Sequence, residues 1–424
     1  MGKNGEFYQM NADTNYVQRV VLIVLLSLIT LSFFHSPGTG DVKYWLQWMK
    51  IYDTQGPFMG FETTQWDYPP FSSIILFGTA RMSHLFSTDY FTSLKLSLTL
   101  FLVISSIIFW VWTRDFFITV ILHLSLLLNS VLLVYIDIFF APWFILALMA
   151  IKERRMTAFT IFYSIACLIK WQPIVIAPFL LLYILNIKQI TDIKEIDLKV
   201  LLINILLPFS VIILITLLLY KMYFLMSFIT GVTTKYLSGD ALNFSWIMTY
   251  FLHVFYPDIF GPLKDGQSGF LITSSLKVLT IPKALFLIFY TGVFLSFLKQ
   301  NKTFENLIYY SLIGYLAYFI FNTGVFENHL FLASILAVIL FFLNKEHLMI
   351  SIFIIIMSNL NLIIFFGTDG KGLSFSRVVG VDITLLLSLL NVAFFLLIWN
   401  SACLKWKRLG KMGHHNNKRT NNEI

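Results

Sequence analysis

The chain has 424 residues, of which 58% are hydrophobic and only 12% are charged, and its mean hydropathy is +0.79. An ordinary soluble domain carries about 25% charged residues, so this composition excludes a soluble enzyme. The formal net charge of +8 indicates cationic loops on the cytoplasmic face of a membrane, and we expect no nucleic-acid partner. Cys167 and Cys403 are too far apart to form a disulfide framework or a metal-ligand cluster.

Twelve apolar runs predict an all-α, polytopic transmembrane protein. They cover residues 17–34, 94–112, 116–136, 138–151, 156–169, 173–187, 200–220, 284–298, 307–321, 330–343, 348–366 and 378–399. A membrane-spanning helix uses about 20 residues, so the shorter runs leave room for short or broken helices near a cavity. No small-x-small cleavage pattern follows the first run, which we therefore expect to be an uncleaved span.

A further apolar segment, 71–86, contains Arg81 and His84, and we expect it to be an interfacial helix on the outer surface. If it crossed the membrane, the basic cluster 152–155 and the basic tail would face opposite sides. With this choice most cations fall on the side of the two termini, which the positive-inside rule assigns to the cytoplasm.

This topology predicts one transmembrane domain, residues 1–404, with long outer loops at about 35–92 and 221–283. Residues 405–424 form a basic cytoplasmic tail that we expect to be disordered and to touch anionic lipid. The two outer loops exceed the length that a simple connection needs, and loops of this length are usually functional or disordered. Their aromatic content argues against disorder.

The first outer loop carries Asp41 at the expected start of a short helix. Asp is a favoured N-cap, and taken alone this residue favours a capping role. Trp45, Trp48 and Tyr52 follow at helical spacing, which predicts an aromatic face that packs on the membrane surface or stacks on sugar rings. The later run 66–70, Trp-Asp-Tyr-Pro-Pro, is equally consistent with a turn before a helix start.

Three more groups of polar residues fall at outer helix ends. Asp137 interrupts an apolar stretch, where an ionisable group is costly unless it faces water or a partner, although a solvated turn also explains it. Lys170 is followed by Trp171-Gln172-Pro173, which also fits a snorkelling lysine beside an interfacial tryptophan. Glu327 and His329 can form an acid/base or phosphate-binding pair, or be solvated surface residues.

Taken together, the five groups support a stronger hypothesis, because all of them fall on the outer side in the predicted topology. They can converge on one cavity at the boundary between lipid and water. Carboxylates with a lysine and a histidine there suit a substrate with a phosphate head and a lipid tail. We find no nucleotide-phosphate loop, zinc motif, serine-nucleophile elbow or internal repeat in the sequence.

At these residues the sequence resembles the GT-C superfamily of membrane glycosyltransferases, which take a sugar from a polyprenyl- or dolichyl-phosphate carrier. The matching features are Gly40-Asp41 with a following Trp, Trp66-Asp67-Tyr68-Pro69-Pro70, Lys170-x-Gln172-Pro173 and Glu327-Asn328-His329-Leu330. The Asp-Tyr-Pro-Pro run resembles that of the glucosyltransferases of the endoplasmic reticulum that build the N-glycan precursor, and that of bacterial relatives. Relatives often have His-Glu in the late motif, whereas this chain has Phe326-Glu327.

The resemblance implies a role for each motif residue. Asp41 would be the general base that deprotonates the acceptor hydroxyl, in a single inverting displacement of the lipid phosphate. The supporting residues it implies are Asp67 and Asp137 for catalytic support, Lys170, His329 and Arg377 for the donor phosphate, and Trp45, Trp66, Tyr68 and Glu327 for positioning the acceptor or the loop. The partners would be a polyprenyl-phosphate-sugar donor, a glycan, glycolipid or protein acceptor, and membrane lipid.

We expect no cofactor, and we expect no metal ion because no paired metal-binding acid motif is evident in the sequence. The resemblance implies the plasma membrane, or the endoplasmic reticulum membrane in a eukaryote. The main alternative is a transporter or flippase of lipid-linked sugars, for which repeated halves and polar, broken spans at mid-membrane would be expected. A catalytically inactive scaffold is a third possibility.

Overall fold

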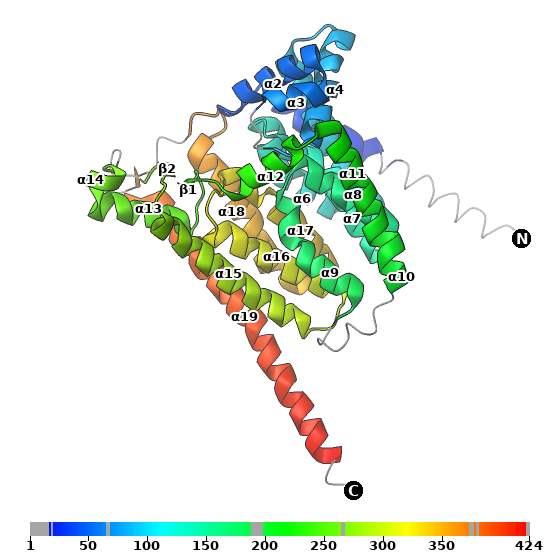
Figure 1. Ribbon diagram of the computed structural model, residues 1–424, viewed down its shortest axis with the longest axis vertical. Helices are drawn as coiled ribbons and strands as arrows, with labels where there is room; N and C mark the ends of the chain where they lie inside the picture. The colour runs from blue at the N-terminus through cyan, green and yellow to red at the C-terminus, as the bar shows by residue number, and fades with distance from the viewer. Residues whose placement is uncertain are drawn as a thin grey trace, which may run out of the picture. The chain divides into compact units, whose positions relative to one another are not determined.

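The structure is a computed structural model, and it is almost entirely helical in the residues that it describes (Figure 1). The described residues are 17, 20–64, 68–187, 198–263, 268–372, 377–378 and 381–420, with the side chains of 200, 377–378, 381 and 404–420 left out. The chain divides into two compact units. The first comprises Met1–Lys170, Phe209–Ser227 and Phe366–Gly372, and the second comprises Trp171–Pro208, Phe228–Phe365 and Leu373–Ile424. The single domain expected from the sequence stays a prediction.

The first unit is built from apolar helices, two of which begin at a capping aspartate. Its elements are the helix Val20–Ser32, α2 (Val42–Gln55), α3 (Pro57–Thr63), α4 (Phe71–Phe86), α5 (Tyr90–Thr113), α6 (Phe116–Leu127), the π-helical turn η1 (Leu128–Leu132), the 3₁₀ turn η2 (Ile136–Phe140), α7 (Ala141–Lys152), α8 (Met156–Ile169) and most of α11 (Leu207–Tyr220). Asp89 caps α5 by accepting a hydrogen bond from the Thr92 N–H (2.9 Å), and Asp115 caps α6 in the same way through the Ile118 N–H (3.0 Å).

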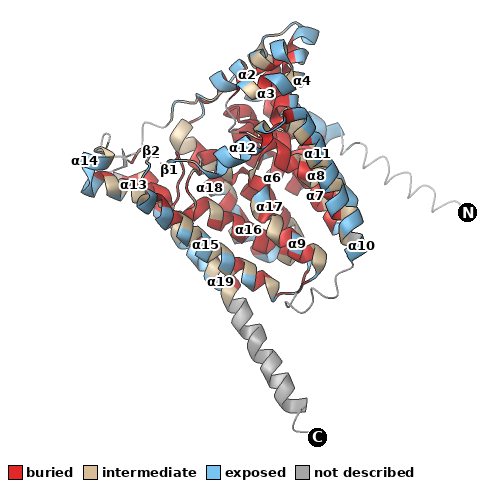
Figure 2. Cartoon of the chain, viewed as in Figure 1, coloured by how far each residue is buried: buried red, intermediate tan, exposed pale blue. Residues whose placement is uncertain are grey.

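The second unit is centred on two buried helices, α16 (Phe304–Phe321) and α17 (Phe331–Leu343), which are mostly red in Figure 2. Its other helices are η3 (Gln172–Ile176), α9 (Ala177–Leu185), α10 (Leu198–Leu201), η5 (Leu202–Leu206), α13 (Phe244–Phe255), α14 (Pro257–Phe260), α15 (Leu276–Leu298), η6 (Glu327–Leu330), η7 (Lys345–His347), α18 (Leu348–Phe366) and α19 (Ile383–Thr420), and α12 (Tyr223–Val232) enters it from the first unit. Two short antiparallel pairs, β1 (Tyr236–Ser238) with β2 (Leu271–Ile272) and β3 (Arg377–Val378) with β4 (Val381–Asp382), are the strands among the described residues.

Six helices in the described part of the chain are long and apolar enough to cross a membrane. They are Tyr90–Thr113, Leu202–Tyr220, Leu276–Leu298, Phe304–Phe321, Lys345–Phe366 and Ile383–Cys403. Most of the other predicted runs form apolar helices of 10–17 residues, so the helical class is confirmed and the count of twelve spans stays a prediction. The segment predicted as an interfacial helix is helical over its whole predicted length as α4, although its position at a membrane is untested. The predicted disorder of 405–424 also stays untested.

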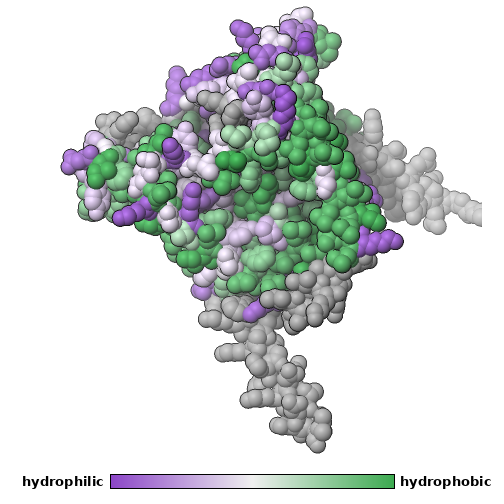
Figure 3. All heavy atoms as spheres, viewed as in Figure 1, coloured by the Kyte–Doolittle hydropathy of each residue, from purple (hydrophilic) through white to green (hydrophobic). Residues whose placement is uncertain are grey.

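The exposed surface of α11 is strongly apolar. In the most hydrophobic stretch of 18 residues within Leu202–Tyr220, only 6% of the residues are buried. Leu214 and Leu218 are among the most exposed side chains of this helix. Figure 3 shows hydrophobic residues over this helix, while more hydrophilic residues gather over α2 to α4. A wide apolar surface of this kind would aggregate in water, so it indicates a helix that faces lipid.

Candidate active site

The turn that carries Asp41 is held by the backbone. Gly38 has a φ of +76°, and a Cβ atom at this position would lie 2.5 Å from a methyl group of Val134, so only glycine fits. The next residue, Thr39, donates its N–H to the Leu133 carbonyl (3.1 Å). Residues 38–41 are therefore attached to the turn that precedes Asp137.

Asp41 occupies the N-cap position of α2, but its side chain makes no capping hydrogen bond. The residue is half-buried, and its carboxylate has no hydrogen bond or ion pair with any residue that the structure describes. The capping role that the sequence allowed is therefore wrong. A half-buried carboxylate without a protein partner retains its lone pairs for a proton or a ligand.

Asp137 and Lys170 form a buried ion pair. Asp137 lies in η2 and Lys170 directly follows α8, and the Lys170 Nζ is 2.6 Å from the Asp137 Oδ1. Their side chains are 0% and 9% exposed, respectively. The alternatives of a solvated turn for Asp137 and a snorkelling lysine for Lys170 are therefore wrong. Two charges removed from water in this way are tolerated only because each compensates the other.

Tyr68 is the second partner of Lys170. The Lys170 Nζ donates a hydrogen bond to the Tyr68 Oη (2.7 Å) and lies 4.0 Å from the centre of the Tyr68 ring, within the range of a cation–π interaction. An ammonium group has three N–H donors. Tyr68 accepts one of them, and the Asp137 carboxylate is held as an ion pair. Lys170 therefore keeps an N–H without a hydrogen-bond partner among the residues described, and this N–H is available to a ligand.

The aromatic face of α2 is turned inward. Trp45 and Trp48 are 3% and 5% exposed, and both rings pack edge-on against Tyr68, at centroid distances of 5.1 and 6.0 Å. The expectation that these side chains pack on the membrane surface or stack on sugars is therefore wrong, because they are buried within the unit. Both rings contact Tyr68, which in turn contacts Lys170. The loop-positioning role of Trp45 stays a prediction.

Asp41 lies within electrostatic reach of the ion pair. Burial raises the pKa of its carboxyl above the ordinary aspartate value, Lys170 and Lys43 oppose this rise, and the negative charge of Asp137 adds to it. The net result is a raised pKa. A carboxylate with a raised pKa holds a proton more readily, which is the property that a general base needs.

Lys95 is a buried residue of this region that sequence reasoning missed. It is 0% exposed on α5, and its Nζ donates to the Val131 carbonyl and to the Ser36 Oγ (2.6 Å). Ser36 in turn donates to the Leu132 carbonyl (2.7 Å). The two side chains thus satisfy carbonyl groups at the end of η1. The chain then turns at Val134, which has a φ of +64° that a β-branched residue rarely adopts.

Asn129 is a second buried polar residue that the sequence did not reveal. It is 3% exposed in η1, and neither its side-chain oxygen nor its nitrogen has a hydrogen-bond partner among the residues that the structure describes. A buried amide without partners costs free energy. π-Helical turns are often found at functional sites, and this one lies in the segment that leads to Asp137.

Glu327 and His329 lie in the second unit, in η6. Glu327 is 5% exposed and its main-chain carbonyl accepts a hydrogen bond from the Asn361 amide (2.8 Å). The His329 Nδ1 is 3.3 Å from the Tyr318 Oη, and the two rings are stacked. The solvated-surface alternative is therefore wrong for the buried Glu327. The meeting of these residues with Asp41 and Lys170 stays a prediction.

Three predicted site residues cannot be placed. Trp66 and Asp67 lie outside the described residues. The backbone of Arg377 begins β3 and is paired with Asp382, but its side chain is outside the description. Their predicted roles stay predictions. Among the residues described, no group of three or more His, Cys, Asp or Glu side chains is placed to hold a metal ion.

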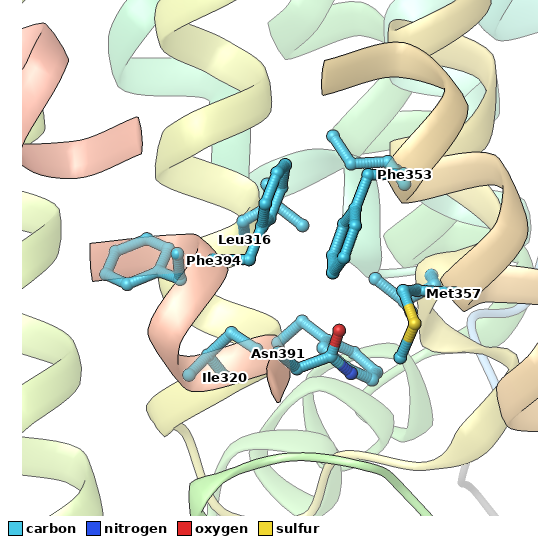
Figure 4. Close-up of a pocket in the computed structure, with 10 residues that line it drawn as sticks. Leu316, Ile320, Phe353, Met357, Asn391 and Phe394 are labelled. Carbon is cyan, nitrogen blue, oxygen red and sulfur yellow. The ribbon is translucent and has the colours of Figure 1, made fainter. Parts of the chain in front are cut away.

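A small apolar cavity in the second unit does not resemble a substrate site. It is lined by Leu316, Phe319, Ile320, Leu330, Phe353, Ile354, Met357, Asn391, Phe394 and Phe395 (Figure 4). Its volume of about 20 Å³ is enough for about one water molecule. Its one polar residue, Asn391, already donates its amide to the Leu242 carbonyl (2.7 Å). The cavity is a packing gap between helices.

No protein-family model matches the chain, and neither does any curated protein sequence. The long apolar helices give the chain the character of a helical membrane protein. Within its first unit, one half-buried carboxylate lies beside one buried ion pair.

Proposed function

We propose that this chain is a glycosyltransferase of the GT-C type, which moves a hexose from a polyprenyl-phosphate donor to a hydroxyl group of an acceptor. The observation that carries the proposal is the position of Asp41. Its carboxylate is half-buried, has no protein partner among the described residues, and lies within electrostatic reach of Lys170. An unoccupied base beside a cation is the arrangement that this reaction requires.

The proposed reaction is a single displacement. The Asp41 carboxylate accepts the proton of the acceptor hydroxyl as the acceptor oxygen bonds to the anomeric carbon. The bond between that carbon and the phosphate oxygen breaks, and the polyprenyl phosphate leaves with the bonding electrons. Attack from the face opposite the leaving group inverts the configuration of the anomeric carbon.

Lys170 is proposed to stabilise the leaving phosphate. Its unused N–H provides a charge-assisted hydrogen bond to a phosphate oxygen, while Asp137 and Tyr68 fix the direction of its ammonium group. His329 and Arg377 are proposed to complete the phosphate site, with Glu327 supporting that loop. Asp67, Trp66 and Trp45 are proposed to position the loops around Asp41.

The proposed membrane arrangement has about twelve crossings with both termini in the cytoplasm. The six long helices supply half of them, and the shorter apolar helices, such as Met156–Ile169 and Gln172–Leu185, supply the others where the protein surrounds a cavity. In this arrangement Asp41 and Lys170 are extracytoplasmic. The membrane is proposed to be the plasma membrane, or that of the endoplasmic reticulum in a eukaryote.

Turnover of defined donors tests the proposal. The purified full chain, reconstituted in nanodiscs, is given a panel of polyprenyl-phosphate hexoses with a membrane extract as the source of acceptor, and free polyprenyl phosphate is measured by mass spectrometry. We expect release from at least one donor, together with a product of inverted anomeric configuration. Release from none of the donors would contradict the proposal.

The same donors distinguish an enzyme from a transporter. A flippase moves the intact lipid-linked sugar across sealed vesicles and leaves the sugar–phosphate bond unbroken. Translocation of the intact donor without release of polyprenyl phosphate would favour the transporter. The charge pattern favours an enzyme, because the ionisable residues that define the candidate site interrupt apolar segments near helix ends.

A further inference from the structure

A groove in the first unit lies apart from the residues of the candidate active site. It is formed by the helix Val20–Ser32 and the last turns of α5, and it encloses about 260 Å³. Its lining residues are Leu22, Ile23, Ile107, Trp110, Val111 and Arg114. All but Arg114 are apolar or aromatic, so the groove offers a hydrocarbon-like channel with one cation.

Arg114 ends α5 with its side chain exposed. Its φ is +57°, and its guanidinium group lies over the Trp110 ring, 5.6 Å from the ring centre. Asp115, the adjacent acid, is engaged at the start of α6, where it accepts the Ile118 N–H (3.0 Å). The Arg114 guanidinium has no carboxylate partner among the described residues, so its five N–H donors are available.

We infer that this groove binds one anionic phospholipid. An acyl chain lies against Leu22, Ile107 and Val111, and the phosphodiester group of the lipid is held by Arg114. A zwitterionic lipid carries an ammonium group that opposes this cation, and free phosphate makes no use of the apolar channel. The preference is thus for a negatively charged headgroup on a membrane lipid. The inference does not depend on the proposed sugar transfer.

Lipid titration of the purified full chain in detergent tests the inference. Dioleoyl phosphatidylglycerol and dioleoyl phosphatidylcholine have the same acyl chains and differ in headgroup charge. Native mass spectrometry measures bound lipid, and the melting temperature measures stabilisation. We expect saturable binding of the anionic lipid at one site, with weaker binding of the zwitterionic lipid and no stabilisation by inorganic phosphate.

Four variants assign the binding to the groove. Arg114→Gln should weaken binding of phosphatidylglycerol about fivefold, Arg114→Lys should retain most of it, and Ile107→Trp should block it by filling the groove. Arg155→Gln is the matched control, because it removes a nearby charge that is already paired with Glu153. The melting temperature without lipid verifies that each variant is folded.

Three results would overturn the inference. They are equal affinity for the two lipids, an equal loss of binding in Arg114→Gln and Arg155→Gln, and full binding by a folded Ile107→Trp variant. The first would show that charge plays no part, the second that only the general surface charge matters, and the third that the acyl chain does not lie in the groove.

Discussion

Removing Lys170 should destabilise the protein strongly, because Asp137 would keep a buried negative charge. At the observed separation of 2.6 Å, the Coulomb attraction amounts to about 6 kcal/mol at an effective dielectric constant of about 20. The cost of desolvating both groups offsets much of this in the intact protein. The measurable quantity is the loss when one partner is removed, and for buried pairs it is about 3–5 kcal/mol.

The measurement is the free energy of unfolding of Lys170→Met in detergent, compared with wild type. The matched control is Lys221→Met, because Lys221 forms an ion pair of similar length with Glu62 (2.8 Å) but has a side chain that is 68% exposed. Exposed pairs contribute little, since water screens them and long side chains lose entropy on pairing. We therefore expect the control to lose far less stability than Lys170→Met.

A double variant separates the structural role of the pair from its proposed catalytic role. Lys170→Met with Asp137→Leu removes both buried charges, so most of the lost stability should return. Sugar transfer should not return, because no cation is left to hold the donor phosphate. The reasoning is refuted if Lys170→Met is no less stable than Lys221→Met, or if the double variant is less stable than Lys170→Met alone.

Three further predictions concern single residues of the same region. The pKa of Asp41 is raised in the folded chain, so the folded state favours the neutral carboxyl and loses stability as the pH rises through the raised pKa. Asparagine stays neutral, so Asp41→Asn should have a higher melting temperature than wild type at neutral pH and the same melting temperature in acid. A difference in melting temperature that does not change with pH would contradict the burial argument. Asn129→Leu replaces an unpartnered buried amide and should gain about 1 kcal/mol in the free energy of unfolding, whereas a loss would mean that the amide has a partner. Lys95→Met leaves the carbonyl of Val131 with only the long hydrogen bond from the Ser36 Oγ (3.4 Å). The variant should cost about 1–3 kcal/mol, a loss that chemical denaturation would detect and that an unaltered midpoint would exclude.

The helical architecture was predictable because apolar runs of sufficient length have few other solutions. α8 (Met156–Ile169) and α18 (Leu348–Phe366) begin and end at the predicted residues. The direction of a helix face was less predictable. The spacing of Trp45 and Trp48 identifies a face, but an apolar face can turn toward lipid or toward protein, and hydrophobicity alone does not distinguish the two in a membrane chain.

Two members of the candidate site could be predicted from the sequence, but their contact with each other could not. Asp137 and Lys170 stand out because ionisable residues in apolar surroundings are costly. Their pairing with each other depends on how η2 packs against α8, which no local pattern reveals. Lys95 was missed because its partners are a backbone carbonyl 36 residues away and a serine 59 residues away, and contacts of this kind leave no spacing in the sequence.

The rate of sugar transfer by the Asp41→Asn variant is the most direct test of the claim that Asp41 is the general base. The substitution keeps the size of the side chain and removes the base, and Asp115→Asn serves as the control because asparagine also caps a helix. Under single-turnover conditions, Asp41→Asn should lose about 10²–10⁴-fold in the rate of sugar transfer, while Asp115→Asn should transfer at nearly the wild-type rate. A folded Asp41→Asn chain that transfers sugar as fast as wild type would contradict the account.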